Sequence, residues 1–177
     1  MFSVISNKKN MLLEKCEEDR IFRVSFTTKE KNEGELVNLI TEDMFFDLMY
    51  QLNNDLISDY KTFSSSDEVY NKEVVVKFDE INEEDDEKKI YLNLKIMTTP
   101  RENGAQILGK NGSYVESDTS YKKGLIDDVI INVKNEGNKV SIVMTFKVID
   151  KNLSTVHEDI MGFMITKVLY RVKQYVE

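Results

Sequence analysis

The sequence predicts an α+β domain in which antiparallel strands form one sheet of about five to six strands, with two amphipathic helices packed on it. Several segments alternate apolar and polar residues with the period of half-buried strands. Two longer segments carry apolar residues at helical spacing. A third kind of segment, residues 99–124, has neither period and is expected to form one long loop or arm. The length of 177 residues suits a single domain over 1–177.

The clearest strand is "RIFRVSFTT" at 20–28, which places Phe22, Val24 and Phe26 on one face. "MLLEKC" at 11–16 is expected to pair with it. Further strands are expected at 73–78, 90–96, 129–134 and 139–149. The last two are separated by "NEGN", whose residues tolerate a positive φ, so they are expected to form a hairpin.

The two helices are expected at 41–60 and 155–176. Thr41 is a suitable N-cap for the first, since acidic residues that favour the helix dipole follow it. Thr155 has the spacing of a capping box at the start of the second. Gly162 lies within that second helix, where the lack of a side chain would permit close packing against a neighbour.

Residues 99–124 contain the only proline and four of the seven glycines of the chain. Structureless segments of this length in compact domains are usually functional or disordered. Because the segment also carries Ile107, Leu108, Tyr114 and Tyr121, it is unlike a plain spacer. These four side chains are therefore predicted to bind a second subunit or another protein.

The run "DEINEEDDE" at 79–87 places seven carboxylates in nine positions. It lacks the glycine and the final bidentate glutamate of an EF-hand calcium loop. A solvated hairpin loop and a partner-facing acidic patch both fit it. The net charge is −8, so removing these seven acids leaves −8 + 7 = −1 for the rest of the chain. The bulk charge thus provides no basic footprint for nucleic acid.

Two patterns imitate catalytic or ligand-binding motifs. "GAQILGK" at 104–110 matches the start of a phosphate loop, but turn residues follow where a helix should begin. His157 has Ser154 and Asp159 near it in sequence, but all three lie at an expected helix start, where serine and aspartate act as caps. We therefore expect neither nucleotide binding nor a catalytic triad.

Metal sites are not expected either. One cysteine and one histidine cannot form the usual structural zinc site. Asp127 and Asp128 with a distant acid could hold magnesium, although nothing in their spacing favours it. Cys16 has no local support for a role as nucleophile and is expected to be a buried or half-buried small residue. No cofactor is predicted.

Without a catalytic constellation, the sequence favours a non-enzymatic structural or assembly protein that forms a homo-oligomer, such as a component of a virus or phage particle. One alternative is a protein-binding adaptor or chaperone-like module, supported by eight methionines. A second alternative is an enzyme that uses carboxylates. No apolar run is long enough to span a membrane, and the first residues do not resemble a signal peptide. An intracellular or virion location is expected.

Overall fold

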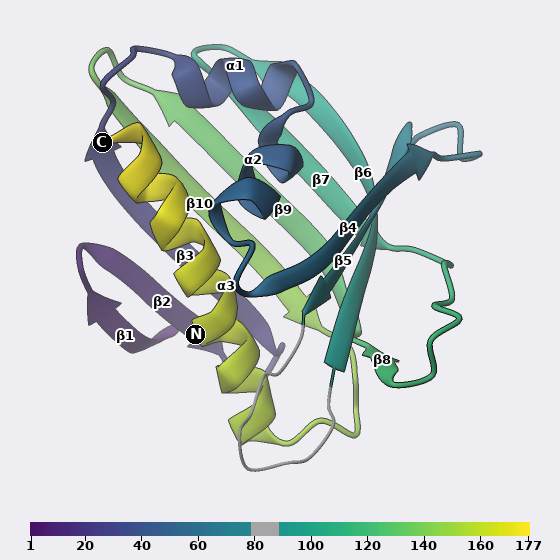
Figure 1. The fold of residues 1–177 in the computed structure, drawn as a ribbon. Helices are drawn as coiled ribbons and strands as arrows, with labels where there is room; N and C mark the ends of the chain where they lie inside the picture. The colour runs from purple at the N-terminus through teal and green to yellow at the C-terminus, as the bar shows by residue number, and fades with distance from the viewer. Residues whose placement is uncertain (79–88) are drawn as a thin grey trace.

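The computed structural model describes residues 1–78 and 89–177 (Figure 1). The described strands are β1 (Ser3–Lys8), β2 (Met11–Cys16), β3 (Ile21–Lys29), β4 (Ile57–Ser64), β5 (Lys72–Phe78), β6 (Lys89–Arg101), β7 (Gly104–Asn111), β8 (Tyr121–Lys123), β9 (Ile126–Asn135) and β10 (Lys139–Val148). The described helices are α1 (Glu35–Thr41), α2 (Phe45–Leu52) and α3 (Thr155–Val176). None of these three helices is long and apolar enough to cross a membrane.

The strands form one sheet in the order β1-β2-β3-β10-β9-β7-β6-β5-β4. Neighbours along this path are antiparallel, and β8 adds a short parallel pairing to β6. The sheet curves around α3, which runs diagonally across its concave face, while α1 and α2 cover one end of that face (Figure 1). The core therefore lies between the curved sheet and α3.

The sheet centre follows the sequence pattern closely. The expected strands at 20–28 and 139–149 are confirmed as β3 and β10, in which Phe22 lies opposite Phe146. Their rings stack with centroids 5.2 Å apart, and both side chains are fully buried. The expected hairpin to β9 is also confirmed, and its turn contains Gly137 at a φ of 74°. Alternation predicts these strands well because one face of each is in the core.

The α+β class holds, but the expected five to six strands and two helices are wrong, since the described residues contain ten strands and three helices. The expected helix at 41–60 is divided between α1, α2 and β4. Thr41 ends α1, where its hydroxyl donates to main-chain carbonyls, and Asp43 has a left-handed φ of 62°. A helix cannot continue through that conformation.

The expectation of a long loop or arm at 99–124 is wrong, because its first half is strand and residues 121–123 form β8. β6 continues through Pro100 to Arg101, and the chain then returns as β7 between β6 and β9. The sequence pattern does not predict β7 as a strand, because Gly104 and Gly109 interrupt its apolar alternation. Both lie where the backbone closely approaches its neighbour: a Cβ on Gly104 would lie 2.1 Å from the Val133 carbonyl oxygen.

The expected C-terminal helix is confirmed as α3, although its N-cap is Ser154, whose side chain accepts from the His157 amide. The role of Gly162 is also confirmed. A Cβ at this position would lie 2.9 Å from two carbons of the Phe22 ring. The helix thus approaches the sheet closely at this residue.

Candidate functional site

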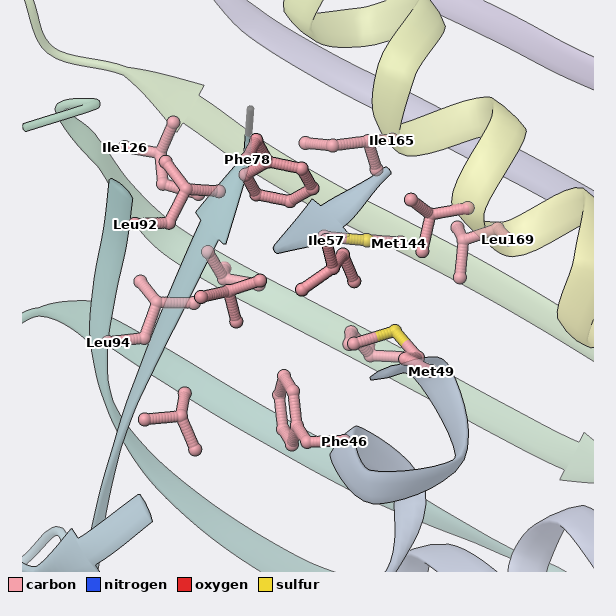
Figure 2. A pocket seen from close by; sticks show the side chains of 15 residues that line it. Phe46, Met49, Ile57, Phe78, Leu92, Leu94, Ile126, Met144, Ile165 and Leu169 are labelled. Atoms are coloured by element: carbon pink, nitrogen blue, oxygen red, sulfur yellow. The ribbon is translucent and has the colours of Figure 1, made fainter. Parts of the chain in front are cut away.

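An internal cavity of about 70 Å³ lies between the concave face of the sheet and the helices (Figure 2). Fifteen residues line it, and all of them are apolar: Phe46, Met49, Ile57, Val74, Val76, Phe78, Leu92, Leu94, Ile126, Val129, Ile131, Met144, Ile165, Val168 and Leu169. The lining contains neither a charged group nor a hydroxyl or amide. Such a lining offers no hydrogen-bond partner to a water molecule.

The lining comes from segments far apart in the chain. α2 contributes Phe46 and Met49, and α3 contributes the Ile165, Val168 and Leu169 stripe. The remaining residues come from β4, β5, β6, β9 and β10, each at positions that face the concave side. Strand alternation and helical spacing therefore direct these side chains to one space, and the sheet curvature keeps the space open.

Two of the lining residues are methionines, Met49 on α2 and Met144 on β10 (Figure 2). Methionine is unbranched and adapts to irregular spaces. An engineered apolar cavity of about 150 Å³ in another protein is known to bind benzene. The present cavity is smaller, so a larger apolar ligand requires movement of these flexible side chains.

A tyrosine hydroxyl of the edge strand β4 lies near this lining. Tyr60 of β4 lies opposite Val76, a lining residue, and its ring stacks on Tyr50 of α2 with centroids 5.7 Å apart. Burial raises the pKa of Tyr60, and the nearby carboxylates of Asp47 and Asp43 raise it further. The hydroxyl therefore stays protonated over the physiological pH range.

The N-terminal end of α3 is fixed by a buried ion network. The Lys15 ammonium of β2 lies 3.1 Å from Glu158 and 3.1 Å from Asp159, both on α3, and 3.0 Å from Glu17. Arg20 also donates to Glu158 through its Nε at 2.6 Å. The Lys15 side chain is 0% exposed and that of Glu158 is 6% exposed. The network therefore holds this end of the helix to β2.

The C-terminal half of α3 is tied to α2. Arg171 donates to both carboxylate oxygens of Asp55, with the Nη2 to Oδ2 distance at 2.8 Å, and to the Leu52 carbonyl at 3.3 Å. This hydrogen bond with Arg171 lowers the pKa of Asp55 to about 2. The pair therefore links this half of α3 to the C-terminal end of α2 and to the turn that follows it.

The four predicted partner-binding residues do not lie on one surface. Ile107 is 2% exposed and belongs to the core, while Leu108, its neighbour in β7, is half-buried. Tyr114 packs against Tyr91 at 6.1 Å and Phe63 at 5.8 Å, and Tyr121 lies beneath Lys77 and Lys89. Binding of a partner through these residues stays a prediction.

Residues 112–120 pack against the sheet around an ion pair. The Lys77 ammonium lies 2.7 Å from Glu116, whose side chain is only 4% exposed. The hydrogen bond from Lys77 lowers the pKa of Glu116 to about 2. The carboxylate is thus charged throughout the neutral and mildly acidic range.

Glu116→Gln is expected to lower the free energy of unfolding by about 1.5–3 kcal/mol at neutral pH, because a hydrogen bond to a charged group is lost. A lowered folded-state pKa adds stability above the unfolded value of 4.5, and this is lost as the pH falls towards about 2. Urea denaturation across this range should show the difference between the two proteins shrinking. A constant difference would contradict the ionic contribution of Glu116.

The motif-like patterns have structural explanations. "GAQILGK" forms β7, and Lys110 pairs with Asp128. Asp127 accepts from the Asn111 amide at 2.9 Å, so it points to a different partner from Asp128. Within 1–78 and 89–177, no group of three histidine, cysteine or acidic side chains could hold a metal ion.

Two of the three remaining sequence candidates lie within the described residues. His157 lies with its Nδ1 2.6 Å from the Ser154 hydroxyl in the capping turn of α3, whereas Asp159 pairs with Lys15. Cys16 is a free thiol and is buried. The acidic run at 79–87 lies outside the described residues.

No family model and no curated protein matches this sequence. Several solved structures have the same fold. Human StAR-related lipid transfer protein 5 matches with a TM-score of 0.71 and 6% identity, covering 99% of this chain and 86% of that protein. A STAR-related lipid transfer protein from Xanthomonas axonopodis gives 0.71 and 6%, covering 99% and 98%. Ginseng major latex-like protein 151 from Panax ginseng gives 0.53 and 9%, covering 89% and 98%.

At these identities the likeness establishes the fold, in which a curved antiparallel sheet wraps a long C-terminal helix. The expectation of a structural or assembly protein, such as a component of a virus or phage particle, is wrong. It rested on the absence of a visible site, whereas the fold is that of lipid transfer structures and contains an apolar cavity. Sequence reasoning treated the cavity-lining residues as ordinary core, because cavity and core residues share one pattern.

Proposed function

We propose that the protein binds the hydrocarbon part of a lipid, or another small apolar molecule, between the sheet and α3. The observation that carries this proposal is a cavity lined by fifteen apolar residues and covered by the long helix. Removing apolar groups from water stabilises a complex by about 0.8 kcal/mol for each buried CH₂. The lipid transfer proteins that share the fold add support to this class of ligand.

The protein is proposed to act as a binding protein rather than as an enzyme. The cavity lining offers no acid, base or nucleophile, because its side chains are hydrocarbon or thioether. An intracellular location suits this proposal, since a chain whose single cysteine is a free thiol has no internal disulfide to preserve.

Ligand binding can be localised through the methionine methyl groups. Isotope-labelled methionine methyls would be followed by NMR while dodecanoate is added. Met49 and Met144 line the cavity, whereas Met97 on β6 is outside the lining. We expect the first two signals to shift with a common saturation curve and the Met97 signal to stay in place. Shifts confined to surface methionines would place the ligand outside the cavity.

A cavity-filling variant tests the same proposal by affinity. Val74→Phe puts a larger side chain into the cavity and is expected to weaken dodecanoate binding by about tenfold or more, because the space for the chain is lost. Val133→Phe is the matched control, since Val133 is buried on the same sheet but outside the lining. Thermal unfolding would confirm that both variants fold. Equal weakening in both variants would contradict binding in the cavity.

A further inference from the structure

A second hollow, separate from the apolar cavity, lies where α1 meets two hairpin turns. This polar depression has a volume of about 360 Å³. Its lining comes from the start of α1, the β6–β7 turn and the β9–β10 turn: Glu33, Gly34, Val37, Asn38, Arg101, Asn103, Gly104, Asn135 and Gly137. It shares no lining residue with the apolar cavity. In Figure 1 these three segments meet at the end of the sheet where α1 lies.

The backbone around the polar depression is held by specific contacts. The Asn135 amide donates to the Asn103 carbonyl at 2.7 Å, which ties the two hairpin turns together. Both carboxylate oxygens of Glu30 accept from main-chain amides, those of Gly34 at 2.9 Å and Leu36 at 3.1 Å. Gly104 packs directly on the next strand, where a Cβ would not fit. The walls are therefore formed before any ligand arrives.

The charged groups of the polar depression are one guanidinium and one carboxylate. Arg101 donates to the Gln106 side chain at 2.5 Å. Over the described part of the chain, neither Arg101 nor Glu33 has an oppositely charged partner. The two groups line one hollow without forming an ion pair with each other. A bare anion would be repelled by Glu33 and a bare cation by Arg101, whereas a ligand with both charges would satisfy each group.

Three amide side chains accompany these charges. Asn38 and Asn103 make no side-chain hydrogen bond within the described residues, and the Oδ1 of Asn135 is buried without a hydrogen-bond partner. The exposed amides of Asn38 and Asn103 can hydrogen-bond a ligand that enters the hollow, whereas the Asn135 oxygen is enclosed by protein. The only apolar lining side chain is Val37, and no aromatic ring is available for stacking a sugar or a base.

We propose that the polar depression binds a small zwitterion that carries an ammonium and a carboxylate, as a free amino acid does. Arg101 pairs with the ligand carboxylate, Glu33 pairs with its ammonium, and the asparagine amides bind its remaining polar groups. Little apolar surface is available for a large side chain, so a short polar amino acid fits the hollow best. This site is independent of the apolar cavity and of the function proposed for it.

Binding would be followed by NMR on protein with isotope-labelled glycine while L-serine is added. Gly34, Gly104 and Gly137 line the polar depression, whereas Gly112 and Gly162 lie elsewhere and serve as internal references. The first three amide signals are expected to shift along one saturation curve. Ethanolamine lacks the carboxylate of serine and 3-hydroxypropanoate lacks its ammonium. Each is expected to bind about two- to fivefold more weakly than serine, since one ion pair with an exposed side chain is lost.

Arg101→Gln and Glu33→Gln are each expected to weaken serine binding by about two- to fivefold, because each removes one exposed charged partner. Glu136→Gln is the matched control, because Glu136 is exposed beside Asn135 but does not line the hollow. It should leave the affinity unchanged. Absence of glycine shifts at the highest soluble serine concentration would overturn the proposal. Equal binding of serine and its two single-charge analogues would do the same, as would tighter binding of glucose.

Discussion

Lys15→Met is expected to lower the free energy of unfolding by about 3 kcal/mol, because it removes one partner of a buried ion network. The Lys15 side chain has no exposed surface, and its ammonium contacts Glu158, Asp159 and Glu17. Methionine keeps most of the packing of the aliphatic stem but leaves carboxylates near β2 without their cation. Glu158 retains Arg20, which places the loss at the lower end of the range for broken buried pairs.

Urea denaturation monitored by circular dichroism measures this loss. Lys134→Met is the matched control, since its ion pair with Glu136 is exposed and is expected to change stability by less than about 1 kcal/mol. If the two variants lost the same stability, the network at the start of α3 would have no special role.

The pKa of Lys15 determines the pH range over which its ion network stabilises the folded protein. Burial alone would lower that pKa, but the hydrogen bonds with Glu17, Asp159 and Glu158 outweigh burial and raise it. A raised folded-state pKa means that the stabilisation is fully present below the unfolded value of 10.5 and is lost only as the pH rises through the folded value. The stability difference between Lys15→Met and the parent protein should therefore be constant from neutral to mildly alkaline pH.

The elements that the sequence predicts correctly are those with one face in the core. β3, β10 and α3 each bury a regular stripe, so the period of their apolar residues is decisive. β4 lies at the edge of the sheet and buries little, and only residues 53–56 separate it from α2. Its pattern alone could not separate it from the preceding helix. β7 could not be predicted as a strand because its glycines resemble turn residues.

The cavity could not be predicted from sequence for a different reason. Its lining residues have the same types and spacing as the rest of the core. Val74 and Val133 both face inward, yet only Val74 lines the cavity. What separates them is the curvature of the sheet and the position of α3, and both depend on pairings between distant segments. The polar depression likewise joins the start of α1 and two hairpin turns that are far apart in the chain.

The distance of α3 from the sheet depends on a single missing side chain. Gly162 faces the ring of Phe22, which is fully buried and stacked on Phe146. A Cβ at this position would lie 2.9 Å from two ring carbons, closer than ordinary contact. The ring is buried and stacked on Phe146, which restricts its movement away from the helix. The helix must therefore move if residue 162 carries a large side chain.

Gly162→Leu is expected to lower the free energy of unfolding by about 3 kcal/mol or more, near the upper limit for overpacked cores. Replacing glycine in a helix ordinarily gains about 1 kcal/mol, so a loss would show that the clash with Phe22 dominates. Lys167→Leu is the control, since Lys167 is exposed on α3 and its replacement should change stability by less than about 0.5 kcal/mol. Chemical denaturation would compare them. A Gly162→Leu variant as stable as the parent protein would mean that α3 can lie further from the sheet without loss of stability. The close approach at Gly162 would then not determine the distance between α3 and the sheet across the cavity.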